Sequence, residues 1–469
     1  MGLTTSSTIY RRRKATKSFD QGPFGDHEFQ VLLSNFRLVC KDTKIKDAIL
    51  SQQQFQKLID LQNFPGFGQK LYQEFTDNET KPLTLNNFLD GVSQCIRSRP
   101  RQALRVMFRI CSGGKEIMPE AEVMGILALV YALCCGMNGN DATVSFSNLQ
   151  GLAYMLTKKA KPAEDGSSKY LNCNDFMGWA EKYVPLFHTP LGAYLEKVLL
   201  TPLSTTDPVP TVVQTRQPVF VPPRLCHSSP ILGQNLMPHV ALLATRTAKM
   251  HGPWVKLYNS QEDGISFNRV CHKILGYGGP TILLIRDTGG AVFGGLAPSQ
   301  WRANNEMYGE GEGFVFRLAP DFRIYPARVG GNGSFMYLNL KGFSLPHGMG
   351  LGGTIGNFRI FLPESLEECT STTRCLTFEN GVLSSAGKGT FEIQDLEIWG
   401  CGGSEDQVQK AMGKQVLVRQ ATADNILKAR KVDKAAFLDN AFDKEFLLGK
   451  TFSTGARAVA DDVREEDNK

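Results

Sequence analysis

Two glutamates in the run YGEGEGFVF are the first side chains whose types and spacing could do chemistry. Glu310 and Glu312 stand two residues apart, so on a β-strand both carboxylates would point to one face, as a general acid and base can. Glycines flank both residues, however, and glycine-rich segments favour turns. The pattern therefore favours two solvated glutamates in a turn over a catalytic pair.

A cysteine and a histidine are adjacent at Cys271 and His272. They fall in a predicted helix, where neighbouring side chains cannot face each other, so a thiolate and imidazole pair is not expected. The seven histidines show no metal-ligand spacing. The tripeptide GKT at 449–451 lacks the opening glycine of a phosphate-binding loop, because position 444 is Lys. The sequence predicts no catalytic residue, no metal site and no cofactor.

The elements that would hold these groups follow from the hydrophobic period. One amphipathic helix is predicted from the apolar stripe Phe267, Val270, Cys271, Ile274 and Leu275. Ser266 is placed to cap its start and Gly276 to end it. A hairpin is predicted at TILLIR, DTGG and AVFGG, and further strands at GFVFRL, RIYPARV, FMYLNL, NFRIFL, CLTF and TFEIQDLEIW. The paired Gly294 and Gly295 indicate that another backbone or ring approaches closely.

Length and composition bound the class of protein. The 469 residues suit two or three domains, and 42% hydrophobic with 21% charged residues is typical of globular chains. The net charge of +6 is small, and no basic face with interleaved aromatics is visible, so no nucleic-acid partner is expected. Eleven cysteines without CxxC pairs indicate a reducing compartment. No secretory signal is expected, and the apolar run 123–137 predicts a buried core helix, because spanning a bilayer takes about 20 residues.

The first residues predict a membrane tether. Met1, Gly2 and Ser6 satisfy the pattern for myristoylation of Gly2. A single myristoyl chain binds membranes only marginally and needs a second signal. That signal is predicted in a basic cluster made by Arg11, Arg12, Arg13, Lys14 and Lys17, because each such charge contributes about 1 kcal/mol near anionic lipid. The alternative is an unmodified, solvated tail over residues 1–25.

Residues 26–200 carry helical periodicity and a repeat. Apolar residues stand five apart, as at positions eight and thirteen of an EF-hand loop, in the pairs Leu50/Phe55, Leu83/Phe88, Met118/Val123, Val144/Leu149 and Leu171/Phe176. The ligand positions depart from those that calcium needs, since they hold Cys111, Gly113 and Lys115, then Thr76, Asn78 and Thr80, and then Glu164, Gly166 and Ser168. The region is therefore predicted to be an all-α, EF-hand-like domain that does not bind calcium.

The rest of the chain divides by composition. Residues 201–236 are rich in proline and predict an extended linker. Residues 404–448 predict a helical extension whose apolar stripe either folds back or binds a partner, with Val408, Met412, Val416, Ile426 and Leu427 as candidate contacts. Residues 449–469 form a polar tail.

The segment from 237 to 403 resembles a TLDc domain. The runs that carry the resemblance are WVKLYNSQEDGISF, GPTILLIRDTGGAVFGGL, YGEGEGFVFRLAP and CLTFENGVLSSAGKGTFEIQDLEIWG. The internal run YLNLKGFSLPHGMGLGG is similar to the lysosomal, mTOR-associated EAK-seven-like subgroup. The resemblance implies an α+β chain: a helical EF-hand-like domain, a TLDc antiparallel β-sandwich with flanking helices, and a C-terminal helix. It also favours myristoylation, because members of the subgroup begin with Met-Gly.

The resemblance implies a non-catalytic adaptor that binds the cytosolic V1 region of the vacuolar proton-pumping ATPase. It places the chain on the cytoplasmic face of lysosomal or endosomal membranes, with a cytosolic pool, and links it to mTOR pathway components. One alternative is an oxidation-resistance protein in which Cys271, Cys375 or the Glu310/Glu312 pair reacts. Another is a calcium-responsive adaptor.

Overall fold

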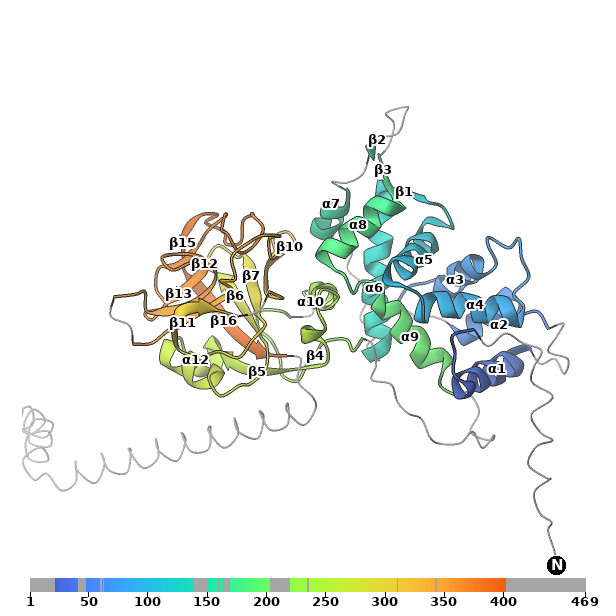
Figure 1. Ribbon diagram of the computed structural model, residues 1–469, viewed down its shortest axis with the longest axis horizontal. Helices are drawn as coiled ribbons and strands as arrows, with labels where there is room; N and C mark the ends of the chain where they lie inside the picture. The colour runs from blue at the N-terminus through green and yellow to red at the C-terminus, as the bar shows by residue number, and fades with distance from the viewer. Residues whose placement is uncertain are drawn as a thin grey trace, which may run out of the picture. The chain divides into compact units, whose positions relative to one another are not determined.

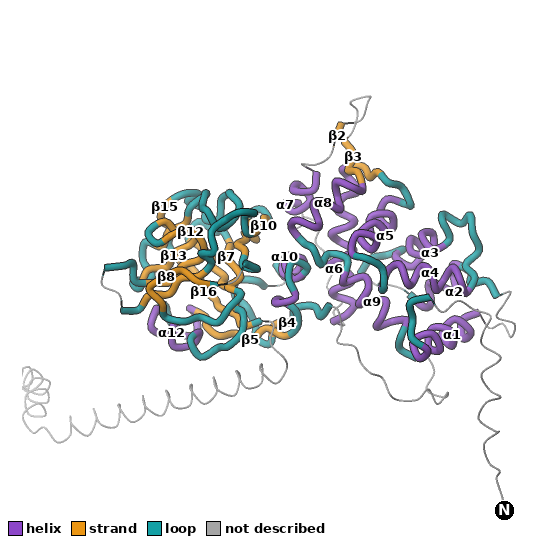
Figure 2. Tube along the Cα trace, in the orientation of Figure 1, coloured by secondary structure: helices purple, strands orange, loops and turns teal. Residues whose placement is uncertain are grey.

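The computed structural model describes residues 22–40, 48–59, 61, 63–138, 150–157, 161–162, 169–202, 220–233, 236–309, 311–341 and 344–401. These residues belong to one compact unit. Helices fill its N-terminal part and strands its C-terminal part, so the predicted α+β class is confirmed (Figures 1 and 2). The domain boundaries given above stay predictions.

The helices of the N-terminal part are α1 (Asp26–Cys40), α2 (Gln52–Leu58), α3 (Phe67–Phe75), α4 (Leu85–Ile96), α5 (Pro100–Ser112), α6 (Val123–Asn138), α7 (Gln150–Thr157), α8 (Cys173–Tyr183) and α9 (Thr189–Leu199). The residues predicted at loop position eight meet across neighbouring loops. Leu50 N donates to Leu83 O at 2.9 Å. Met118 lies opposite Leu171, where β1 (Ile117–Pro119) and β3 (Lys169–Asn172) pair antiparallel. A third short strand, β2 (Lys161–Pro162), extends this small sheet.

The residues predicted at loop position thirteen enter the core. Phe55, Phe88, Val123 and Phe176 are all fully buried, and the Phe55 and Phe88 rings meet edge to face at 6.5 Å. Helix α6 is apolar all round and packs against α7 and α9. By length and composition alone Glu120–Met137 could cross a membrane, but 61% of it is buried inside the protein, as the core-helix prediction requires.

The C-terminal part is a sandwich of two sheets. One has the order β10-β9-β7-β6-β16-β5-β4 and the other β15-β14-β13-β12-β11-β8. The strands are β4 (Arg224–Leu225), β5 (Pro253–Asn259), β6 (Thr281–Asp287), β7 (Val292–Ala297), β8 (Asn304–Tyr308), β9 (Phe314–Ala319), β10 (Arg323–Pro326), β11 (Met336–Asn339), β12 (Gly348–Thr354), β13 (Asn357–Pro363), β14 (Cys369–Ser371), β15 (Gly389–Phe391) and β16 (Ile393–Gly400). Neighbouring strands run antiparallel except β4 beside β5. Three helices accompany the sheets: α10 (Met237–Ala244), α11 (Ser260–Asp263) and α12 (Phe267–Ile274).

The paired glycines of β7 lie where the sequence predicts close approach. A Cβ atom on Gly294 would collide with the carbonyl oxygen of Leu283 on the neighbouring strand. One on Gly295 would lie 2.7 Å from a methyl group of Leu351 on the facing sheet. The hairpin of β6 and β7 is confirmed. Only glycine fits this point of the sandwich without displacing a neighbour.

Several local predictions are wrong. CLTF does not form a strand, because only Phe378 makes an isolated bridge, with Ala327. TFEIQDLEIW is interrupted at Glu392, and the two strands it forms join different sheets. Ser266 stands at the start of α12, but its side chain makes no capping hydrogen bond. The glycine-rich strand β12 is absent from the predictions.

The glycines of strand β12 make room for aromatic rings. A Cβ on Gly350 would lie 2.7 Å from the Phe358 ring, and one on Gly352 would meet the ring of Phe378. The strand therefore has few side chains of its own on one face, and the alternating pattern that indicates a strand is lost.

The described end of the proline-rich segment is held against the first sheet. Glu397 on β16 accepts hydrogen bonds from the Ser229 hydroxyl at 2.6 Å and from Ile231 N at 3.1 Å. Arg286 on β6 donates to the carbonyl oxygens of Pro230 and Ile231. Residues 228–232 are thus fixed by charged side chains of two neighbouring strands.

Candidate functional site

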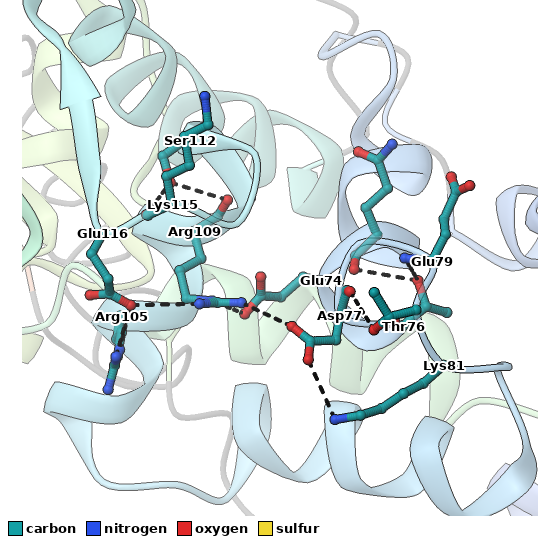
Figure 3. Close-up of polar contacts among 12 residues, drawn as sticks. Glu74, Thr76, Asp77, Glu79, Lys81, Arg105, Arg109, Ser112, Lys115 and Glu116 are labelled. Carbon is teal, nitrogen blue, oxygen red and sulfur yellow. Dashed lines mark hydrogen bonds and ion pairs between the residues drawn. The ribbon is translucent and has the colours of Figure 1, made fainter.

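A polar cluster of the helical part lies where the second and third EF-hand-like loops meet over Arg109. Arg109 lies on helix α5. This helix has Pro100 in its first turn and is capped at its C-terminal end by Gly113 in the left-handed conformation. Arg109 Nε donates to Glu74 Oε1 at 2.7 Å. Its Nη2 and Nη1 atoms lie 3.7 Å from Asp77 Oδ1 and 3.6 Å from Glu116 Oε1 (Figure 3). One guanidinium therefore ties α3, its following loop and the loop after α5.

The electrostatics of the cluster follow from burial. The Glu74 side chain is 10% exposed, and its Oε2 atom is buried without a hydrogen-bond partner. Burial accordingly raises the pKa of the Glu74 carboxyl, against the opposing effect of Arg109. Glu116 is more exposed, and although burial acts the other way, hydrogen bonds and charge from Arg105 and Arg109 lower its pKa. A polar hollow of 270 Å³ adjoins this cluster.

The loop after α3 is not shaped as a calcium loop. Asp77, Asn78 and Glu79 take φ of 51°, 56° and 66° in succession. At the position where calcium loops carry a bidentate glutamate, Asn87 turns its amide to donate to Pro82 O at 2.7 Å. Asp77 forms an ion pair with Lys81 at 3.4 Å (Figure 3). The Asp77 and Asn87 side chains therefore contact neighbouring groups of the protein.

The next loop is closed in the same internal way. The Ser112 hydroxyl donates to Lys115 O at 2.6 Å (Figure 3), and Cys111 is buried. The loops that contain Glu164, Gly166 and Ser168, and the repeat pair Val144/Leu149, lie outside the described residues. Among the residues that the structure describes, no group of three or more His, Cys, Asp or Glu side chains could hold a metal ion.

In the sandwich the structure separates the residues that sequence placed side by side. Cys271 faces the core and burial raises the pKa of its thiol to about 12, whereas His272 is exposed on the other face of α12. Cys375 is also buried, and its sulfur accepts from Phe378 N at 3.2 Å. Glu312 stands exposed in a turn, 3.5 Å from Lys249 Nζ. Its predicted partner Glu310 lies outside the described residues.

The cysteines, with one exception, are buried. All are free thiols and all are buried except Cys226, which is partly exposed. Burial raises the pKa of the Cys111, Cys173 and Cys369 thiols to about 12 as well. A protonated thiol is a poor nucleophile, so these side chains are suited to packing rather than to reaction with oxidants.

All of the predicted lipidation, membrane-binding and partner-binding residues lie outside the described residues. These are Gly2 with Arg11, Arg12, Arg13, Lys14 and Lys17, and in the C-terminal extension Val408, Met412, Val416, Ile426 and Leu427. The sequence, in contrast, does not predict the Arg109 cluster. Its members Glu74, Arg109 and Glu116 are far apart in the chain and follow no shared spacing, so only the packing of the two loops reveals them.

Comparison with known proteins supports the resemblance seen in the sequence. Residues 225–402 match the TLDc domain family, and the two-sheet sandwich described above occupies that range. Residues 225–402 therefore form a TLDc domain.

Among its relatives are proteins named MTOR-associated protein MEAK7. The zebrafish (Danio rerio) protein is 28% identical over 274 residues, which is 57% of this chain and 56% of the relative. The human (Homo sapiens) protein is 29% identical over 177 residues, 37% of this chain and 38% of the relative. Oxidation resistance protein 1 of Xenopus tropicalis is 33% identical over 147 residues, 31% of this chain and 16% of the relative. The chain is thus matched over about half, or less, of each relative's length.

Proposed function

We propose that this chain is a non-catalytic adaptor, tethered to the cytoplasmic face of lysosomal or endosomal membranes, that binds the V1 region of the vacuolar proton-pumping ATPase. The TLDc domain and the extension 404–448 form the contact, and a pool of the protein is cytosolic. The relatives named for mTOR association favour a link to mTOR signalling. The observation that carries the proposal is the TLDc match over residues 225–402.

The site geometry agrees with a docking role. The candidate reactive groups of the sandwich are separated or buried: Cys271 and His272 face opposite ways, and the Cys271 thiol has a raised pKa. The polar cluster around Arg109 is internally paired. Both features suit a rigid scaffold that presents surfaces to other molecules.

Affinity isolation from detergent-solubilised endolysosomal membranes tests the pump contact. Full-length protein is expected to recover V1 subunits, and removal of residues 404–469 should reduce recovery at least tenfold. The variant Val408→Ser, Met412→Ser, Val416→Ser should act like the truncation, because it removes the apolar stripe. The matched variant Gln407→Ser, Gln409→Ser, Gln415→Ser should stay within about twofold of wild type. Equal recovery by all four proteins would remove the extension from the proposal.

The tether is tested separately by fractionation. Gly2→Ala should move the protein from the membrane to the soluble fraction, because one basic cluster without an acyl chain gives weaker attachment. Thr4→Ala, which leaves the acylation pattern intact, should fractionate like wild type. If Gly2→Ala also fractionates like wild type, the acyl tether is wrong while the pump contact is unaffected.

An antioxidant role is the second candidate function, because one relative is named Oxidation resistance protein 1. A thiol survey under peroxide separates the two functions. The adaptor account predicts that Cys226, the partly exposed cysteine, reacts first and that Cys271 and Cys375 react only on unfolding. Rapid oxidation of Cys271 or Cys375 in the folded protein would favour the antioxidant function.

A further inference from the structure

Three loops of the sandwich carry exposed aliphatic side chains at their tips. Val329, in the loop between β10 and β11, is fully exposed, and Leu376, in the loop after β14, is 59% exposed. Ile355 stands in the two-residue turn between β12 and β13 and is 37% exposed. Single exposed aliphatic residues are ordinary, but a group on one surface indicates an interaction site.

Hydrogen bonds hold the three loops together. The Thr377 hydroxyl accepts from Gly353 N at 2.8 Å and lies 2.6 Å from Asn332 Oδ1. The Asn332 amide donates to Gly353 O at 2.8 Å, and Arg328 N donates to Thr377 O at 2.8 Å. Thr377, buried at the centre, thus contacts each loop. The aliphatic tips stand on a fixed base rather than on independent segments.

Two arginines accompany the tips. Arg328 and Arg374 are exposed, and within the described residues neither forms an ion pair. Arg328 Nη1 donates to the carbonyl oxygen of Cys375 at 3.2 Å. With Asn357, Leu376 and others they line a hollow of 420 Å³. Residues 327–335, 353–357 and 372–378 contain no acidic side chain. Glu379, the next residue, pairs with Lys182 at 2.6 Å and is thereby neutralised.

We call this surface the loop-tip surface (Arg328, Val329, Ile355, Arg374 and Leu376). Its positive charge indicates the kind of partner that it binds. An anionic lipid bilayer places phosphates over hydrocarbon. Exposed aliphatic side chains beside arginines that form no ion pair complement such a surface. We propose that the loop-tip surface docks on anionic phospholipid bilayers, with Val329 and Leu376 entering the acyl boundary and Arg328 and Arg374 contacting headgroup phosphates. This contact is additional to the Gly2 tether and independent of the pump.

The test uses the full chain with the N-terminal signals removed, by Gly2→Ala together with glutamine at the five basic tail positions. In this background Val329→Trp reports insertion, because the four native tryptophans are buried in the protein. Its emission should shift to the blue on vesicles of phosphatidylcholine with phosphatidylserine, and brominated lipids should quench it. Ile265→Trp, at a position of similar exposure to Leu376, should show neither effect. Inorganic phosphate alone should not shift the Val329→Trp emission.

Binding strength gives the second readout. Val329→Ser with Leu376→Ser should lower partition into these vesicles at least tenfold, because two aliphatic side chains no longer enter the bilayer. Arg328→Gln and Arg374→Gln should each lower it about fivefold, and pure phosphatidylcholine should bind weakly. Ile265→Ser should leave partition unchanged. All these positions are exposed, so folding should be retained.

Two results would overturn the inference. One is an unchanged Val329→Trp emission while the protein is bound to vesicles. The other is wild-type vesicle partition by Val329→Ser with Leu376→Ser combined with reduced recovery of V1 subunits, which would make the loop-tip surface a protein contact.

Discussion

The arginines of the helical part and those of the loop-tip surface differ in what they contact. Arg105 and Arg109 are bound to Glu74, Asp77 and Glu116. Arg328 and Arg374 stand exposed beside aliphatic tips with no acidic side chain in their loops. An arginine is structural where its charge is already paired with carboxylates, and it is available for binding where it forms no ion pair. Under the proposed function, the helical part is a scaffold and the sandwich presents the contacts.

The largest expected effect is a loss of stability on substitution of a glycine inside the sandwich that supports the loop-tip surface. Gly294→Ala should destabilise the fold by about 4 kcal/mol or more, because its Cβ would collide with the Leu283 backbone. Gly278→Ala, at an exposed position with nothing within 4 Å of the new Cβ, should change stability by less than about 0.5 kcal/mol. Denaturant unfolding measures both, and similar values would mean that β6 and β7 can separate.

The next effect compares the two kinds of arginine directly. Arg109→Leu should cost about 2 kcal/mol, since it leaves the buried Glu74 carboxylate uncompensated; fully buried pairs cost about 3–5 kcal/mol. Arg374→Leu should change stability by less than about 0.5 kcal/mol. Thermal and urea unfolding would report these differences. An equal loss for both variants would erase the distinction between paired and available arginines.

A smaller effect depends on pH through Glu74. Burial raises the folded pKa of this carboxyl above its unfolded value, so protonation favours the folded state. The resulting stability is fully present below the unfolded pKa and is lost as pH rises through the folded pKa. Wild type should therefore gain stability relative to Glu74→Gln as pH falls from 7 to 4. The opposite slope would show that the effect of Arg109 outweighs burial, so that the folded pKa of Glu74 lies below its unfolded value.

The smallest effect concerns calcium. Because Asn87 and Asp77 are engaged within their own loop, millimolar calcium should shift the Tm by less than about 1 °C. Binding at a hundred times the Kd would stabilise the fold by about 2.7 kcal/mol, which a thermal melt detects easily. Magnesium serves as the matched control ion. A rise in Tm specific to calcium would restore the sensor hypothesis.

Local spacing explains what the sequence could predict. The position-eight and position-thirteen residues, such as Leu50 and Phe88, repeat at fixed intervals and recur in the observed loop pairing. Gly294 and Gly295 were recognisable because glycine inside an apolar strand has few other reasons to occur. The helix at Phe267–Ile274 was visible from a single stripe.

Long-range packing explains what the sequence could not. Strand β12 has no alternating pattern, because its glycines accept rings from Phe358 and Phe378. The Arg109 cluster and the loop-tip surface each join residues from separate segments. Thr377 illustrates the point: a threonine in a run that resembles a strand is in fact the centre that joins three loops.

The proposed function is docking on the vacuolar proton pump. Purified full-length protein mixed with purified pump particles in detergent tests it most directly, with co-elution and pump ATPase rate as readouts. The account predicts saturable co-elution that is lost when residues 225–402 or 404–469 are missing. Failure of the full chain to co-elute at any concentration would contradict it.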